Sequence, residues 1–251
     1  MDDSIIKMEN LEIKARELRR KVLDLSVKTG EAHLGGSFSM IEIIISLYDV
    51  IMKKEDKFIL SKGHCSYPMY LLLKERGYNP KVSTHPDIDI ENGICCTTGS
   101  LGHGLPIGVG MAIARKFKRQ KGKIYVLLGD GECQEGTTWE SSLIASQHKL
   151  DNLIAIIDYN KIQALDRLEN ILSLNNLAKK FDVFGWYASE VNGHSFPELI
   201  DVLNQTYNGK PLAIIAHTIK GKGVSYMENN PEWHARKARS ERVKQAYEEL
   251  K

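Results

Sequence analysis

The chain has 251 residues, 42% of them hydrophobic, which is enough to bury the core of one large α/β domain. Its net charge of +2 is too small to indicate a nucleic-acid partner, and its clusters of lysine and arginine are expected to be solvated helix faces. We find no signal-peptide pattern and no apolar run near the roughly 20 residues that cross a bilayer, so a cytoplasmic protein without membrane contact is expected.

The first part of the chain shows mainly helical spacing of its apolar residues. An amphipathic helix is expected over residues 10–29, and Ser39 is expected to cap a second helix over residues 40–52. A short strand over residues 58–60 then leads into a helix over residues 67–76.

Strand and helix patterns alternate in the rest of the chain. Residues 80–99 contain proline and glycine and predict a long loop, a kind of segment that is often functional in compact domains. A helix containing residues 109–117 follows. The alternation is typical of a doubly wound parallel sheet with helices on both faces. We expect strands over residues 123–128, 153–158, 186–191 and 211–216, and helices over residues 136–148, 174–184 and 196–207.

The four cysteines do not have the spacing of a zinc site, and two of them are adjacent, which is a poor disulfide framework. We therefore expect reduced, partly buried thiols at Cys65, Cys95, Cys96 and Cys133.

Two of the predicted strands end in oxygen-bearing side chains. Asp130 lies in a Gly-Asp-Gly turn after the run at 123–128, and Asn160 follows the run at 152–157. Because the carboxyl ends of parallel strands meet at one edge of the sheet, the two side chains are expected to converge on one bound ion. Mg²⁺ suits such a site, since it takes one or two carboxylates and fills its shell with phosphate oxygens and water. For an isolated Gly-Asp-Gly, a plain strand-terminal turn is an equal alternative.

Gly-Asp-Gly followed by Asn160 resembles the diphosphate and Mg²⁺ motif of thiamine-diphosphate enzymes, and four histidine segments narrow the resemblance to the transketolase family. The matching segments extend over nearly the whole chain. The histidines are His33 in Gly30-Glu-Ala-His-Leu-Gly-Gly36, His64 in Leu60-Ser-Lys-Gly-His-Cys-Ser66, His85 before Pro86, and His234 in Pro231-Glu-Trp-His234.

The resemblance implies thiamine diphosphate and Mg²⁺ as cofactors. It implies that Asp130 and Asn160 bind the metal through side-chain oxygens and that Ile162 binds it through its main-chain carbonyl. Gly131 is implied to donate a backbone N–H to the cofactor diphosphate, and Ser100 and Leu101 are implied to contact the cofactor rings. These last contacts follow from the family pattern alone.

The same resemblance implies catalytic roles for the four histidines. His64 and His234 are expected at the diphosphate and the reacting centre, and His33 and His85 at the hydroxyls of the donor sugar. Imidazole suits this work because its ordinary pKa allows proton transfer near neutral pH.

Other polar residues near these motifs have two interpretations each. Glu135 and Glu140 are implied to lie at the subunit contact that links two cofactor sites, with Glu135 also binding cofactor, whereas either carboxylate could simply stabilise a helix N-terminus. Lys220 and Lys222 could line the diphosphate entrance or be flexible surface lysines. His148, His194 and His217 are expected mainly as structural residues.

Full-length members of the family continue into a pyrimidine-binding domain, which supplies a glutamate to the cofactor, and then into a third domain. We therefore expect residues 1–251 to form a single diphosphate-binding domain with the pyrimidine and C-terminal domains absent. A separate C-terminal transketolase subunit would supply them, in a dimer of heterodimers.

The expected reaction is transfer of a two-carbon ketol unit from a ketose, expected to be phosphorylated, to an aldose. Two alternatives stay open: a subunit of another thiamine-diphosphate enzyme, such as a deoxyxylulose-phosphate synthase-like or 2-oxoacid dehydrogenase-like one, and a non-catalytic cofactor-binding subunit. The sequence leaves the donor and acceptor sugars and the pathway open.

Overall fold

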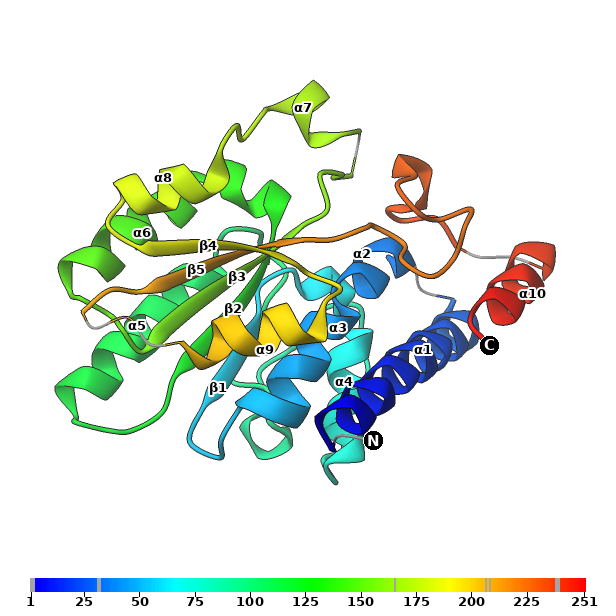
Figure 1. Cartoon of the computed structure of the whole chain (residues 1–251), viewed down its shortest axis with the longest axis horizontal. Helices are drawn as coiled ribbons and strands as arrows, with labels where there is room; N and C mark the ends of the chain where they lie inside the picture. The colour runs from blue at the N-terminus through cyan, green and yellow to red at the C-terminus, as the bar shows by residue number, and fades with distance from the viewer. Residues whose placement is uncertain (1–2, 31–32, 165, 206, 208, 238–239) are drawn as a thin grey trace.

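A parallel five-stranded sheet forms the centre of the protein (Figure 1). The computed structural model describes residues 3–30, 33–164, 166–205, 207, 209–237 and 240–251. The strand order is β1-β2-β3-β5-β4, and each neighbouring pair is parallel, which confirms the predicted α/β class. The strands are β1 (Lys57–Leu60), β2 (Ile124–Gly129), β3 (Leu153–Tyr159), β4 (Tyr187–Asn192) and β5 (Leu212–His217).

Helices cover both faces of this sheet (Figure 1). Among the helices in the described ranges, none is long and apolar enough to span a bilayer. The α-helices are α1 (Asp3–Thr29), α2 (Leu34–Ser39), α3 (Ile41–Ile45), α4 (Tyr67–Glu75), α5 (Gly104–Phe117), α6 (Gly136–Gln147), α7 (Leu168–Ile171), α8 (Leu177–Val183), α9 (Phe196–Asn204) and α10 (Ser240–Glu249). The shorter turns are a π-helix, η1 (Ser46–Ile51), and the 3₁₀ helices η2 (Gly63–Cys65), η3 (Ile90–Asn92), η4 (Asp130–Gln134) and η5 (Pro231–Trp233).

The central strands face two separate hydrophobic cores because successive side chains of a strand point to opposite faces. Tyr125 and Leu127 of β2 join the core under α1, α3, α4 and α9. Val126 and Leu128 join the core under α5, α6 and α8. Burial on both faces explains why these strands are near-continuous apolar runs in the sequence.

The predicted helix over residues 40–52 is wrong in its start and its regularity. Ser39 does not cap it but ends α2, and Met40 separates α2 from α3, which passes into the π-helix η1. The Ser39 hydroxyl contacts Gly36 O at 3.1 Å and Asp158 Oδ2 at 2.6 Å. The Ser39 side chain, which was expected to cap a helix, is therefore hydrogen-bonded to Asp158, a residue far away in the sequence.

The C-terminal helix α10 packs along α1, as Figure 1 shows. Ala246 and Leu250, within and just after α10, are buried in the same core as α1, and the Tyr247 hydroxyl donates to Asp24. The sequence analysis did not predict this helix. All four cysteines are free thiols, as expected, and Cys65 and Cys133 are buried.

Candidate functional site

A cavity of about 280 Å³ lies beyond the carboxyl ends of β1, β2 and β3. Its lining combines residues from segments far apart in the chain, including the ends of β2 and β3, the loop after residue 80 and the segment after β5. Parallel sheets present their ligand sites at this edge. Most of the sequence-predicted site residues line it: His33, His64, His85, Leu101, Asp130, Gly131, Asn160, Ile162 and His234.

Asp130 provides the carboxylate at one end of the cavity. It is 3% exposed, and its two oxygens accept backbone N–H groups from Gly131 at 2.8 Å and from Lys161 at 2.5 Å. Lys161 has a φ of 64°, a left-handed conformation that turns the chain after β3 back toward Asp130. Burial, and then the neighbouring Asp158, raise the pKa of Asp130 to about 6. A cation beside this buried carboxylate would favour its charged form.

The group of oxygen atoms at this end fits Mg²⁺. Asn160 is 6% exposed, and its Oδ1 accepts the Ile162 N–H at 3.2 Å, which holds the amide oxygen on the same turn as the Ile162 carbonyl. One carboxylate, one amide oxygen and one carbonyl leave the remaining positions of an octahedral ion to phosphate oxygens and water. Among the residues that the structure describes, no group of three or more His, Cys, Asp or Glu side chains could hold a metal ion.

Lys220 enters this end of the cavity as a buried cation. Its ammonium donates to Ile162 O at 2.8 Å and to His234 Nδ1 at 2.8 Å, and it is 3% exposed. Burial, and then repulsion from Lys62, lower the pKa of Lys220 to about 8. The interpretation of Lys220 as a surface lysine is therefore wrong. Lys222 is partly exposed, lies 3.7 Å from Glu228 and is not in the cavity lining.

Three of the predicted histidines form a cluster. The ring centres of His33 and His64 are 5.2 Å apart, those of His33 and His234 are 5.6 Å apart, and those of His64 and His234 are 5.7 Å apart. His33 has a φ of 73°, a conformation that costs energy for a non-glycine residue and recurs at functional sites. His85 lines the same cavity from the long loop, with its ring against Gly99.

Two imidazoles at the cavity are neutral near physiological pH. Burial, followed by the nearby cations Lys62 and Lys220, lowers the pKa of His64 to about 4. Burial, followed by Lys220, lowers the pKa of His234 to about 2. Since the Lys220 ammonium can only donate, His234 Nδ1 accepts its hydrogen bond and Nε2 carries the ring proton.

Lys62, which lines the cavity, forms a buried ion pair with Asp158. Lys62 donates to Asp158 and to Gly36 O, at 2.9 Å for the latter, and Ser39 and Thr218 also donate to Asp158. Burial alone would raise the pKa of Asp158, but the Lys62 ammonium holds it below its usual value.

Sequence reasoning missed three buried charged residues: Lys62, Asp158 and Glu132. Of these, Lys62 and Glu132 line the cavity. The signal was a charged residue inside or directly beside a quoted motif. Lys62 stands between Ser61 and His64, Asp158 interrupts an apolar strand, and Glu132 follows the Gly-Asp-Gly turn.

The remaining predicted residues lie outside the cavity lining. Ser100 is exposed, with its Oγ 3.2 Å from His103 Nδ1. Glu135 and Glu140 are exposed on and before α6, where they are accessible to another chain. Roles for these three residues stay predictions.

The other histidines have positions that agree with structural roles. His194 accepts the Ile219 N–H at 2.8 Å and lies 2.9 Å from the Glu42 carboxylate. His217 pairs with exposed Glu190 at 2.6 Å. His148 is exposed at the end of α6.

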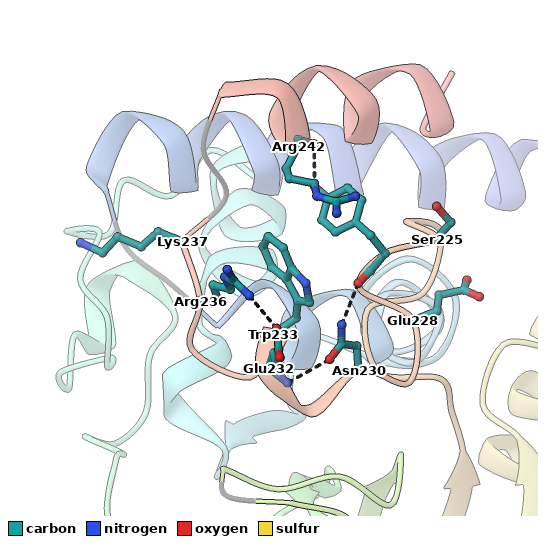
Figure 2. Close-up of a pocket in the computed structure, with 9 residues that line it drawn as sticks. Ser225, Glu228, Asn230, Glu232, Trp233, Arg236, Lys237 and Arg242 are labelled. Carbon is teal, nitrogen blue, oxygen red and sulfur yellow. Dashed lines mark hydrogen bonds and ion pairs between the residues drawn. The ribbon is translucent and has the colours of Figure 1, made fainter.

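A larger, polar groove of about 620 Å³ lies beside α10 (Figure 2). Figure 2 shows Arg236 bonded to Glu232 next to Trp233, while Lys237 points away from them. The Arg242 guanidinium lies 4.8 Å from the centre of the Tyr226 ring. The groove thus contains Arg236, Lys237 and Arg242, and both of these arginines have partners in the chain. It does not bring together titratable groups of the kind found in the first cavity.

The chain is similar to known proteins over nearly all of its length. A family model described as "Transketolase, thiamine diphosphate binding domain" matches residues 12–250. The chain is 40% identical over 269 residues to an apulose-4-phosphate transketolase subunit of Actinobacillus succinogenes, covering 98% of each protein. It is 36% identical to a 6-deoxy-6-sulfo-D-fructose transketolase subunit of Clostridium, covering 96% of each.

Solved structures show the same resemblance. The transketolase of Campylobacter jejuni superposes with a TM-score of 0.85 at 29% identity. That match covers 96% of this chain and 42% of the C. jejuni chain, so the present chain spans less than half of the solved transketolase.

Proposed function

This chain belongs to the transketolase family, and on that premise we propose that it is the cofactor-binding subunit of an enzyme that transfers a two-carbon ketol unit from a ketose to an aldose. The observation that carries the proposal is the cavity at the ends of β2 and β3. It combines an oxygen-rich end at Asp130 and Asn160 with a cluster of three histidines. Such a pairing suits a diphosphate-bearing cofactor at one end and a polyhydroxylated substrate at the other.

Asp130, Asn160 and the Ile162 carbonyl would hold Mg²⁺, and Gly131 would donate its N–H to the diphosphate. In this structure two of these groups have partners within the chain: Ile162 O accepts from Lys220, and the Gly131 N–H donates to Asp130. Both contacts would be exchanged when the cofactor binds. Thiamine diphosphate supplies, when bound, the carbon that attacks a ketose carbonyl and holds the resulting negative charge.

The histidines would bind and orient the sugar and exchange its protons. A neutral imidazole has one donor and one acceptor nitrogen, so it can donate a hydrogen bond to one hydroxyl and accept a hydrogen bond from another. His234 presents its Nε2–H to substrate, because Nδ1 accepts from Lys220. His64 lies beside His33 in the same cluster, and His85 faces the cavity from the long loop.

We propose that a separate C-terminal transketolase subunit completes the active site. The relatives that match this chain over nearly their whole length are named transketolase subunits, which supports a divided enzyme. In that arrangement residues 1–251 serve as one diphosphate-binding domain, and the partner brings the pyrimidine-binding domain. Exposed Glu135 and Glu140 would lie at the contact between cofactor sites in a dimer of heterodimers.

The proposed donor is a phosphorylated ketose. The named substrates of the relatives are a phosphorylated sugar in one case and a sulfonated sugar in the other, so an anionic substituent is common to both names. A cytoplasmic location stays a prediction of the sequence.

Reconstitution tests the proposal. The chain is purified alone and together with a co-expressed candidate partner that carries the pyrimidine-domain pattern, each with thiamine diphosphate and Mg²⁺. We expect ketol transfer between sugar phosphates only from the complex. Full activity of the isolated chain would contradict the divided active site. Cofactor binding without transfer by any such complex would favour the non-catalytic alternative.

A further inference from the structure

Glu132 connects three segments around the cavity. It lies in η4, two residues after Asp130, and is 1% exposed. Its Oε1 accepts the Ser61 hydroxyl at 2.5 Å and the Gly102 N–H at 2.9 Å, and its Oε2 accepts the Gly129 N–H at 2.8 Å. One carboxylate thus binds the end of β1, the end of β2 and the glycine-rich loop before α5.

Ser61 extends this connection by one further hydrogen bond. Its Oγ accepts the Gly104 N–H at 3.1 Å, which leaves its own proton to be donated to Glu132. A Cβ on Gly104 would lie only 2.3 Å from the Ser61 Oγ, so this approach requires glycine. The first residue of α5 and the loop before it are therefore both fixed to the same carboxylate.

All three hydrogen bonds to Glu132 come from neutral donors. A carboxylate is suited to this position because it is acceptor-only and both of its oxygens face donors. Glutamine would present an NH₂ group to at least one of these donors and leave that donor without its acceptor. The two carboxylate oxygens therefore fix the geometry of several backbone segments at once.

The segments fixed by Glu132 belong to the two ends of the cavity. Gly129 and Glu132 flank Asp130 and Gly131, the expected metal and diphosphate end. Gly102 directly follows Leu101, which lines the cavity and is expected to face the cofactor rings. The side chain of Glu132 therefore bonds directly to both segments.

We propose that Glu132 is a positioning residue that couples the diphosphate end of the cofactor site to the loop at its ring end. This inference rests on the proposed function, since the bound cofactor defines the two ends. Without the carboxylate, the loop over residues 99–104 loses its connection to β2, and the cofactor must order it on binding. Cofactor affinity then falls, because binding has to offset the conformational entropy of the loop.

The experiment compares the wild-type chain with Glu132→Gln by two measurements. The first is hydrogen–deuterium exchange, without cofactor, of peptides that cover residues 99–104; we expect exchange at least about tenfold faster in the variant, as a lost buried hydrogen bond allows. The second is the Kd for thiamine diphosphate in excess Mg²⁺, by calorimetry; we expect it to rise about 10- to 100-fold, the usual effect of losing a supporting hydrogen-bond partner.

Matched variants separate coupling from general damage. Glu42→Gln removes another buried carboxylate, which does not line the cavity, and should raise exchange over residues 99–104 much less than Glu132→Gln does. Ser61→Ala removes one donor to Glu132 and should repeat both effects more weakly, which keeps the inference testable if Glu132→Gln does not fold. Ser142→Ala is the control for that change: Ser142 is a buried serine whose hydroxyl donates within α6.

If Glu132→Gln folds and shows the same exchange and the same Kd as the wild-type chain, the inference is wrong. If only Ser61→Ala folds, the same exchange and Kd as the wild-type chain in that variant would overturn it. Failure of the proposed function gives a different result. If the wild-type chain, alone and with its partner, does not bind thiamine diphosphate, the proposed function is wrong, while the exchange comparison still reports whether Glu132 fixes the loop.

Discussion

Asp130 is the single residue on which the expected metal site depends most. It is the only carboxylate among the three expected ligands, and it is buried with both oxygens directed by backbone N–H groups. An amide in its place keeps the shape of the side chain but removes the charge that attracts a divalent cation.

We therefore expect Asp130→Asn to raise the Kd for thiamine diphosphate in the presence of Mg²⁺ by about 100-fold or more, since even outer-shell losses cost 10- to 100-fold. Calorimetric titration checks this. Asp151→Asn is the matched control, because Asp151 lies before β3 at the opposite end of the sheet and pairs with Lys116. Equal affinities of Asp130→Asn and the wild-type chain would contradict the assigned metal site.

His33 gives the corresponding test of the substrate side. We expect His33→Ala, in the reconstituted enzyme, to lower the ketol-transfer rate by about 10²- to 10⁴-fold, the usual contribution of a proton-transferring side chain. The Kd for thiamine diphosphate should stay within a few-fold of wild type. His148→Ala, on the surface at the end of α6, should leave both quantities unchanged. A parallel loss of cofactor binding in His33→Ala would instead assign His33 to the cofactor.

At the scale of elements, a triad centred on the buried carboxylate of Glu42 joins α1, α3 and the turn after β4. Arg19 and Glu42 pair at 2.8 Å and are both nearly inaccessible, and His194 lies 2.9 Å from the same carboxylate. The triad fixes the position of the long helix α1 against the sheet, and with it the start of the segment that carries His33.

Removing one member of a buried pair leaves the other charge without compensation. We expect Glu42→Gln to lower the free energy of unfolding by about 3 kcal/mol, within the 3–5 kcal/mol typical of such losses. Urea denaturation at pH 7 measures it. Glu190→Gln breaks an exposed carboxylate–histidine pair and should cost less than about 1 kcal/mol. Similar small losses in both variants would show that the triad does not stabilise the fold.

The contribution of Glu42 also depends on pH. Burial would raise the pKa of Glu42, but Arg19 and His194 hold it below its usual value of about 4.3. The unfolded chain therefore binds the proton more readily, so the stabilisation is complete above that usual value and is lost as pH falls through the lower, folded-state pKa. In urea denaturations at decreasing pH, the stability difference between wild type and Glu42→Gln should narrow below about pH 4. A constant difference would contradict the lowered pKa.

Elements differed in how well the sequence predicted them. The strands β2, β3 and β5 were predicted within one or two residues because each is an apolar run buried on both faces. The region around Ser39 was predicted poorly, since its side chain contacts Asp158 rather than its own helix. Helix α10 was missed because its burial depends on α1, at the other end of the chain.

At the scale of the whole molecule, cofactor binding should appear as a gain in stability. A ligand that binds only the folded state at 100 times its Kd adds about 2.7 kcal/mol to the free energy of unfolding. We expect thiamine diphosphate with Mg²⁺ to raise the Tm in differential scanning fluorimetry, and a chelator in excess to abolish the rise. A rise that persists in chelator would contradict a diphosphate held through the metal.

The sequence by itself determined the parallel sheet, the positions of Asp130 and Asn160 at strand ends, and the histidine motifs. These features depend on short-range patterns: the apolar runs place the strands, and parallel strands place their carboxyl ends at one edge. Only the tertiary structure decided the burial of Lys220, the 5.2 Å approach of His33 to His64, and the three segments held by Glu132. Each of these depends on contacts between residues far apart in the chain, whose distance and burial no local pattern specifies.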